Sequence, residues 1–135
     1  MLILCTGNSA RSQMAEGLFR SLAGDRWEVF SAGTHPSLVR PEAIAVMAEL
    51  GIDLSGHRSK SVDEFLGMAF DCVITVCDNA QESCPVFPAT TQRLHWSFED
   101  PAAMAGDEAT RLGAFRRIRD QIAARLRQAL VAGLL

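Results

Sequence analysis

Apolar residues along this chain follow two alternating patterns. Short apolar or alternating runs predict strands over residues 1–5, 27–32, 70–77 and 93–98. Stretches with apolar residues three or four positions apart predict helices over residues 12–24, 41–51 and 108–135, with a short helix near 65–68 behind a capping box that starts at Ser61. Strands that alternate with helices predict an α/β fold, a small doubly wound, four-stranded parallel sheet with helices on both faces.

Composition narrows the class of protein. The chain has 135 residues, of which 48% are apolar, and 16 acidic against 13 basic residues give a net charge of −3. These values predict one globular domain over residues 1–135 and do not favour a nucleic-acid partner. No apolar run approaches the length of a membrane span, and Met1–Cys5 does not resemble an export signal, so we expect no membrane association and a cytoplasmic location.

The loop after the first predicted strand is the first candidate for chemistry, because ligands of open α/β sheets bind beyond the carboxyl ends of the strands. Gly7 and Asn8 tolerate a positive φ, which lets successive backbone N–H groups form a concave nest for an anion. The helix that follows adds the donors of its N-terminus. The predicted oxyanion-binding residues are Thr6, Gly7, Asn8, Ser9, Ala10, Arg11 and Ser12.

Cys5 and Arg11 are the reactive candidates within this loop. The nest should lower the pKa of the Cys5 thiol and favour the thiolate, and Ser12 can donate a hydrogen bond to the sulfur. Arg11 can hold two anion oxygens in a planar fork. A Cys followed six positions later by an Arg arises by chance in about one chain in three of this composition, so a merely buried Cys5 is the alternative. The strand, the loop and the helix around the pair favour the functional interpretation.

Three further cysteines lie at positions 72, 77 and 84. Cys77 ends the third predicted strand, so it should share a sheet edge with Cys5, and residues 78–83 form a polar segment, predicted as a short helix or mobile loop, that could carry Cys84 to Cys77. A redox pair is favoured, with inert thiols or a zinc site completed by His57 or His95 as alternatives. Cys72 is predicted to pack in the core.

Five motifs distributed along the chain resemble one known family. They are CTGNSARSQMAEG at residues 5–17, FSAGT at 30–34, VCDNA at 76–80, CPVFP at 84–88 and DP at 100–101. These motifs are similar to those of the low-molecular-weight protein tyrosine phosphatases, and most closely to their arsenate reductase branch. Ala10 departs from close relatives, which often carry another Cys there.

The resemblance implies that Cys5 is the nucleophile, Arg11 the oxyanion clamp and Asp100 the general acid in either branch. Phosphatases of the family typically carry Tyr after the Asp-Pro pair, whereas residues 102–104 here are Ala-Ala-Met and the chain has no Tyr. Reduction of arsenate needs two electrons, which Cys77 and Cys84 could supply by forming a disulfide. We therefore expect an arsenate reductase, with a phosphatase as the alternative and an anion-binding sensor as a third interpretation.

The family resemblance also implies a catalytic cycle. Arsenate would form an adduct with Cys5, Cys77 would displace arsenite by forming a Cys5–Cys77 disulfide, and Cys84 would then form a Cys77–Cys84 disulfide. Thioredoxin, or another thiol reductant, would reduce that disulfide. No covalently bound cofactor is expected. A potassium ion is implied beside the loop, at Asn8, Glu16 and Ser31.

Overall fold

A computed structural model describes residues 1–78, 87 and 91–135. Its elements, in chain order, are β1 (Leu2–Cys5), α1 (Arg11–Ala23), β2 (Phe30–Gly33), α2 (Pro41–Ala48), the 3₁₀ helix η1 (Val62–Phe65), β3 (Cys72–Thr75), β4 (Gln92–His95), the 3₁₀ helix η2 (Pro101–Ala103) and α4 (Glu108–Val131). The alternation of strands and helices predicted from the apolar pattern is confirmed. Residues 79–86, which include Cys84, lie outside the described part of the chain.

The four strands form one parallel sheet in the order β2-β1-β3-β4. β1 lies between β2 and β3, with Cys5 opposite Gly33 and Leu4 opposite Thr75. The strand order reverses between β1 and β3. The chain first passes from β1 to β2 on one side of β1, and then crosses back to β3 on the other side of β1. In open α/β sheets this reversal leaves a crevice at the carboxyl ends of the two strands. Cys5 ends β1 at that crevice, and Cys77 follows β3 there.

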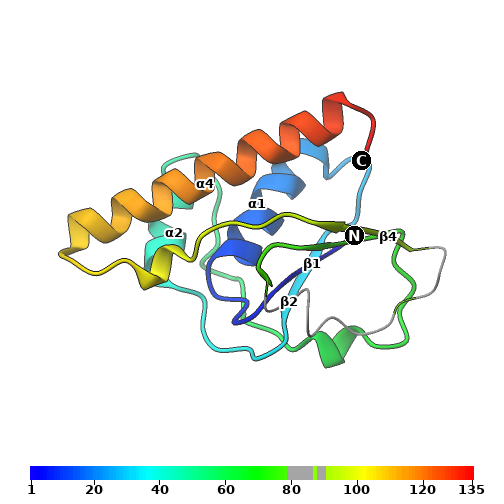
Figure 1. The fold of residues 1–135 in the computed structure, drawn as a ribbon, viewed down its shortest axis with the longest axis horizontal. Coiled ribbons are helices and arrows are strands. Elements are labelled where there is room, and N and C mark those ends of the chain that lie inside the picture. The colour runs from blue at the N-terminus through cyan, green and yellow to red at the C-terminus, as the bar shows by residue number, and fades with distance from the viewer. Residues whose placement is uncertain (79–86, 88–90) are drawn as a thin grey trace.

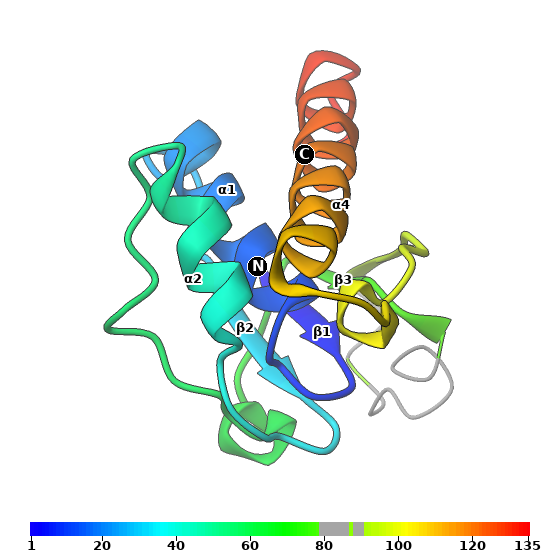
Figure 2. The same cartoon turned by 90° about the vertical axis from the view of Figure 1, so that its left-hand side faces the viewer.

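Within the described part of the chain, the helices α1, α2 and α4 lie together on one face of the sheet (Figures 1 and 2). α1 packs against α4, and α4 against α2. The long helix α4 contributes a fully buried stripe to this layer, formed by Phe115, Ile118, Ile122 and Leu126. A stripe repeated every three or four residues is typical of an amphipathic helix, and its burial holds α4 against α1 and α2.

The opposite face of the sheet carries η1 (Figure 1). Four aromatic rings contact one another in this region, each with a centroid about 5.5 to 6.3 Å from a neighbour's: Phe30, Phe65, Phe70 and Phe87. Edge-on and tilted contacts of this kind stabilise a core beyond the apolar area that they bury. The two layers fix β1 from both sides and so hold the start of the loop in place.

Several element boundaries differ from the sequence prediction. The third and fourth strands were expected over residues 70–77 and 93–98, and the pairing is confined to 72–75 and 92–95. The short helix begins at Val62 rather than near residue 65, because Ser61 Oγ accepts a hydrogen bond from Asp63 N and caps a 3₁₀ turn. The second helix ends at Ala48, three residues before Gly51, which has a φ of 74°.

In the described part of the chain, no helix is long and apolar enough to cross a membrane.

Candidate active site

The loop between β1 and α1 is held from outside through its carbonyl groups. Thr6 O accepts a hydrogen bond from His35 N at 2.8 Å, and Ser9 O accepts one from Arg40 N at 2.8 Å. Gly7 O accepts one from Ser59 Oγ at 2.8 Å. In a planar trans peptide the N–H points opposite to the C=O. With these carbonyls directed outward, the N–H groups that follow them point into the loop, as an anion nest requires.

Gly33 makes this close approach possible. A Cβ atom on Gly33 would lie 2.6 Å from Thr6 O and 2.9 Å from Asn8 N, both of them backbone atoms. Any larger residue would therefore displace the loop. The residue lies opposite Cys5 in the parallel register of β1 and β2. The sequence marks it only as part of the FSAGT motif and indicates no role for it.

Asn8 is the buried centre of the loop. Its φ of 47° lies in the left-handed region, and its side chain has no exposure to solvent. The amide Nδ2 donates to Ser12 Oγ at 2.9 Å and to Ser31 Oγ at 3.0 Å, and Oδ1 accepts from Lys60 N at 2.9 Å. Asn tolerates this backbone conformation better than most residues, and its four-point capacity for hydrogen bonds is used here to fix the turn.

Gln13 joins Asn8 to a more distant segment and was not predicted. Its Nε2 donates to Asn8 Oδ1 at 2.9 Å, to Asn8 O at 3.1 Å and to Arg58 O at 3.0 Å, and its Oε1 lies 3.0 Å from His57 Nδ1. His57 was weighed as a zinc ligand, but its Nδ1 faces Gln13 and Glu16 at 3.0 Å each. A ring N–H between two oxygen acceptors acts as a donor. His57 therefore supports the loop indirectly, through Gln13, which contacts Asn8.

Glu16 is a buried carboxylate surrounded by donors. Its Oε2 lies 3.0 Å from His57 Nδ1 and 3.5 Å from Arg20 Nη1, and its Oε1 lies 4.0 Å from Lys60 Nζ. Burial alone would raise the pKa of Glu16, but the hydrogen bond from His57 and the charges of Lys60 and Arg20 outweigh burial and lower it. Glu16 is therefore held as the anion.

The potassium ion expected at Asn8, Glu16 and Ser31 does not fit these residues. Asn8 Oδ1 already accepts two hydrogen bonds, from Gln13 Nε2 and Lys60 N. Ser31 Oγ faces the Asn8 amide nitrogen, and the Glu16 carboxylate faces the Lys60 ammonium. A hard cation needs several oxygen atoms with available lone pairs, and these three side chains use theirs on the protein's own donors.

The thiols of Cys5 and Cys77 contact each other. Both are buried, and the structure joins their side chains by a hydrogen bond. Thr6 Oγ1 lies 3.3 Å from Cys77 Sγ. Two segments about 70 residues apart in sequence thus meet at the reversal of the strand order, and the expectation that Cys77 shares the sheet edge with Cys5 is met by this contact.

The expected lowering of the pKa of Cys5 is wrong for this arrangement. The hydrogen bond with Cys77 is the main cause that raises the pKa of Cys5, and burial adds to it, while Arg11 and the backbone of Thr6 act in the opposite direction. The sequence-based expectation considered only the loop and its dipoles, and not a second thiol. Two contacting thiols resist carrying two negative charges at once, because a second charge is repelled by the first.

Arg11 and Asp100 lie side by side at the rim of the loop. Arg11 Nη1 donates to Phe98 O at 3.1 Å, and its Nη2 lies 3.9 Å from Asp100 Oδ2. The Arg11 side chain is 14% exposed and that of Asp100 is 46% exposed. Asp100 Oδ1 also accepts from Ala102 N at 3.0 Å, which caps η2 and fixes the carboxyl group. The structure brings these two predicted residues together.

The remaining cysteine and histidine candidates have other partners. Cys72 is buried in β3, and burial raises the pKa of its thiol to about 11, in keeping with the predicted packing role. His95 Nδ1 lies 2.7 Å from Thr75 Oγ1, and its Nε2 lies 2.9 Å from Asp78 Oδ1. Among the described residues, no group of three His, Cys, Asp or Glu side chains could hold a metal ion.

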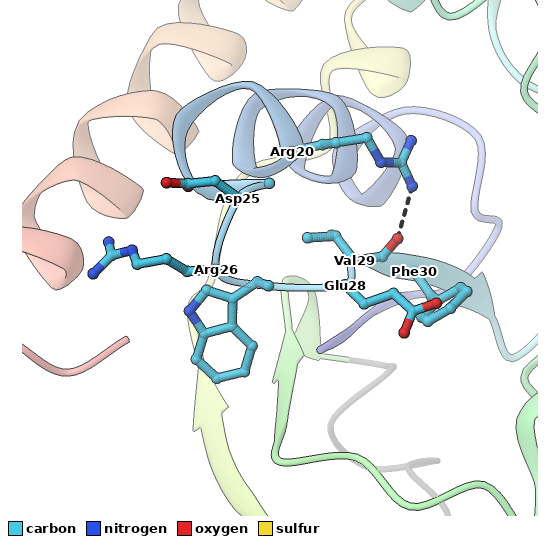
Figure 3. Close-up of a pocket in the computed structure, with 8 residues that line it drawn as sticks. Arg20, Asp25, Arg26, Glu28, Val29 and Phe30 are labelled. Atoms are coloured by element: carbon cyan, nitrogen blue, oxygen red, sulfur yellow. Dashed lines mark hydrogen bonds between the residues drawn. The ribbon is translucent and has the colours of Figure 1, made fainter.

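A pocket of about 480 Å³ lies away from the loop, between the end of α1 and the start of β2 (Figure 3). Its lining residues include Arg20, Asp25 and Trp27, and Arg20 Nη2 donates to Val29 O at 2.7 Å across it. Phe30, which also lines it, lies at the opposite end of β2 from Gly33. The reactive residues of the loop therefore do not contribute to this pocket.

Comparison with known proteins agrees with this geometry. The family model of low molecular weight phosphotyrosine protein phosphatase matches residues 1–134. An arsenate reductase of Halalkalibacterium halodurans is 44% identical over 124 residues, which cover 92% of this chain and 89% of that protein.

Two solved structures extend the likeness to three dimensions. An arsenate reductase in the phosphate-binding state has a TM-score of 0.77 at 35% identity and covers 97% of this chain and 95% of its own. A thioredoxin-dependent arsenate reductase of Corynebacterium glutamicum has a TM-score of 0.74 at 28% identity and covers 97% of this chain and 59% of its own. The chain therefore belongs to the low molecular weight phosphotyrosine protein phosphatase family, and within it to the arsenate reductases.

Proposed function

We propose that this chain, acting as one domain over residues 1–135, reduces arsenate to arsenite with electrons from its own thiols. The observation that carries the proposal is the contact between Cys5 and Cys77 at the base of the loop. A phosphatase needs one nucleophilic thiol, whereas a reductase needs a second thiol within reach of the first. The relatives named arsenate reductase support the same choice.

The first step forms an adduct in the loop. Arsenate binds to the inward N–H groups and to the fork of Arg11. A similar arsenate reductase has been solved in a phosphate-binding state, which supports an oxyanion as the ligand. The Cys5 thiolate attacks arsenic, an As–O bond breaks, and Asp100 supplies the proton with which the oxygen leaves as water. Arg11 and Asp100 lie close enough at the rim to act on the same oxyanion.

The second step moves the electrons. The Cys77 thiolate attacks Cys5 Sγ, the S–As bond breaks, and its electron pair stays on arsenic, which leaves as arsenite. Two thiols lose two electrons and arsenic(V) gains two, so the step balances as a Cys5–Cys77 disulfide forms. Thr6 Oγ1, 3.3 Å from Cys77 Sγ, is placed to orient the attacking sulfur.

The third step resets the loop. Cys84 attacks Cys77, which frees Cys5 and leaves a Cys77–Cys84 disulfide for an external dithiol to reduce. We propose thioredoxin as this dithiol, supported by the thioredoxin-dependent reductase of Corynebacterium glutamicum. Cys84 lies outside the described residues, so its part rests on the sequence. A cycle that begins with reduced thiols fits a reducing cytoplasm.

The other loop residues have supporting roles in this proposal. Ser12 Oγ accepts from Asn8 Nδ2, which directs its own O–H for donation to the Cys5 sulfur. Ser9 supports the turn through its carbonyl, which accepts from Arg40 N. Ala10 ends the loop in the core beside α1, and none of these steps needs a thiol at that position.

A phosphatase reaction is the second candidate, because Cys5, Arg11 and Asp100 suffice for it. The wall beyond Asp100 is formed by η2, Pro101–Ala103, and then by Met104. These side chains offer no aromatic ring against which an aryl group could stack. We therefore expect aryl phosphate hydrolysis to be a weak side activity.

The decisive experiment follows arsenite release by variants of the relay thiols. With thioredoxin as the sole reductant, Cys84→Ser should release about one arsenite per enzyme and then stop as a Cys5–Cys77 disulfide. Cys77→Ser should stop earlier, at the arsenic adduct, which intact-protein mass spectrometry detects. Sustained turnover by Cys84→Ser with thioredoxin alone would exclude the three-thiol relay.

Matched controls separate reduction from hydrolysis. Both Ser variants should still hydrolyse an aryl phosphate, because neither Cys77 nor Cys84 is a reactant in hydrolysis. Thr6→Val should slow the release of arsenite from the adduct, while Thr6→Ser should retain it, because only the first change removes the hydroxyl next to Cys77. Equal loss of both activities in Cys77→Ser would point to a structural role instead.

A further inference from the structure

We propose that the ammonium group of Lys60 is a built-in cation that neutralises Glu16 beneath the loop, so that the loop is set without a monovalent metal ion. The proposal rests on the function of the loop as an oxyanion site. It concerns the chain's one lysine, in a sequence that has twelve arginines. This one lysine lies next to the buried carboxylate of Glu16.

The charges around Glu16 carry the argument. The Glu16 side chain is 6% exposed and the Lys60 side chain 13%, so water screens neither group well. Lys60 Nζ lies 4.0 Å from Glu16 Oε1, and it donates to Arg58 O at 3.2 Å. A buried carboxylate without a cation is strongly destabilising. An ammonium is a compact point charge, which suits a position that a metal ion would otherwise take.

The backbone of Lys60 connects this charge to the loop. Lys60 N donates to Asn8 Oδ1 at 2.9 Å, and Lys60 O accepts from Gly33 N at 2.8 Å. One residue thus joins the left-handed Asn8 of the loop, the end of β2 and, through its side chain, Glu16 of α1. These are the elements that a bound ion beneath the loop would have to join.

Besides the His57 ring, the other basic side chain at Glu16 is Arg20, which is fixed elsewhere. Arg20 Nη1 lies 3.5 Å from Glu16 Oε2, and half of the Arg20 side chain is exposed. Its Nη2 donates to Val29 O at 2.7 Å (Figure 3). Arg20 therefore reaches Glu16 from the solvent side. Lys60 is the cation on the Oε1 side, toward the loop, and a second cation there would meet its charge directly.

The test compares potassium with choline at constant ionic strength, using thermal unfolding of the reduced protein without substrate. The unmodified protein should unfold at the same temperature in both salts. Lys60→Met, which keeps the length of the side chain but removes the charge, should lose roughly 5 °C in choline. Potassium should restore a saturable part of this loss, because an ion that binds only the native state stabilises it by mass action.

A neighbouring basic residue supplies the control. Arg58 forms an exposed ion pair with Glu64 and does not face Glu16, so Arg58→Met should respond equally to both salts. The state of the loop is measured by how well bound inorganic phosphate protects Cys5 from an alkylating reagent. Protection should weaken about tenfold in Lys60→Met in choline and recover with potassium.

Two results would overturn the proposal. One is a stabilisation of the unmodified protein by potassium relative to choline, and this measurement stands even if Lys60→Met fails to fold. The other is a Lys60→Met variant whose unfolding temperature and phosphate protection match the unmodified protein in choline. Neither measurement involves arsenate turnover, so failure of the proposed reductase activity would leave this test intact.

Discussion

The floor and the rim of the loop are built in opposite ways. The floor consists of Asn8, Ser12, Gln13 and Ser31, which have no solvent exposure and are joined by hydrogen bonds of about 2.9 to 3.1 Å. The rim consists of Arg11 and Asp100, which are 3.9 Å apart, with Asp100 46% exposed.

This difference indicates that the floor fixes the conformation of the loop, whereas the rim supplies the groups that act on the oxyanion. A buried polar network is costly unless every member is paired, so the floor has one stable arrangement. An ion pair at 3.9 Å with one half-exposed member is weakly held in water, so Arg11 and Asp100 can turn to an oxyanion without unfolding of the protein. Floor variants should therefore lose stability together with activity, whereas rim variants should lose activity alone.

Arg11→Lys should show the largest effect. It keeps the charge but loses the planar fork, and arsenate turnover should fall by about 10³-fold, with the unfolding temperature unchanged within about 2 °C. Steady-state kinetics and thermal unfolding on the same sample test this separation. Turnover near that of the unmodified enzyme would show that Arg11 does not clamp the oxyanion.

Asp100→Asn should have the next largest effect. The amide keeps the cap on Ala102 N but cannot supply a proton, so kcat should fall by about 10²-fold with little change in the unfolding temperature. The decisive comparison is kcat against KM, because a general acid acts in the transition state. A raised KM with an unchanged kcat would instead make Asp100 a binding residue.

Gln13→Ala tests the floor. It removes a hydrogen bond from the Asn8 amide, from Arg58 O and from His57, each of which keeps one other partner in the structure, so unfolding should become easier by about 2 kcal/mol. Gln92→Ala, an exposed Gln with one long hydrogen bond to Leu134 O, should change stability by less than about 0.5 kcal/mol. Equal stabilities of the two variants in urea unfolding would contradict a rigid floor.

The smallest expected effect is the change in stability at acidic pH that is due to Glu16. Because the pKa of Glu16 is lowered in the folded protein from its ordinary value of 4.5, its contribution to stability is fully present above that value and is lost as the pH falls through the lowered pKa. The stability difference between the unmodified protein and Glu16→Gln should therefore shrink below about pH 4.5. A difference that grows in this range would mean that Glu16 is not held as the anion.

The loop, with Arg11, could be predicted from the sequence because its signals are local, whereas the role of Asp100 at the rim was implied only by the family resemblance. A continuous apolar run ends at Cys5, and Gly7, Asn8 and the start of α1 follow within a few positions. Each of these residues constrains its own backbone. The parallel sheet follows from the same alternation of elements, since few topologies accommodate it.

The floor could not be read in this way. Gln13 and His57 are 44 positions apart, and Asn8 and Lys60 are 52 apart, so nothing near either residue in the sequence indicates its partner. The solitary lysine was the one available signal. The pKa of Cys5 was predicted in the wrong direction for a related reason, because its main cause is Cys77, a residue brought in by the crossing from β2 to β3.

The adjacency of β1 and β3 also has a consequence for the polymer physics of the proposed cycle. A Cys5–Cys77 disulfide would close a ring of about 70 residues and lower the entropy of the unfolded chain by the equivalent of about 4 kcal/mol, whereas a Cys77–Cys84 disulfide would close about eight residues, worth about 2.5 kcal/mol. The first crosslink ties together half of the molecule, and the second constrains only one short segment. Passing the disulfide along the chain therefore exchanges a global crosslink for a local one and returns the sheet to its unconstrained form before the reductant acts.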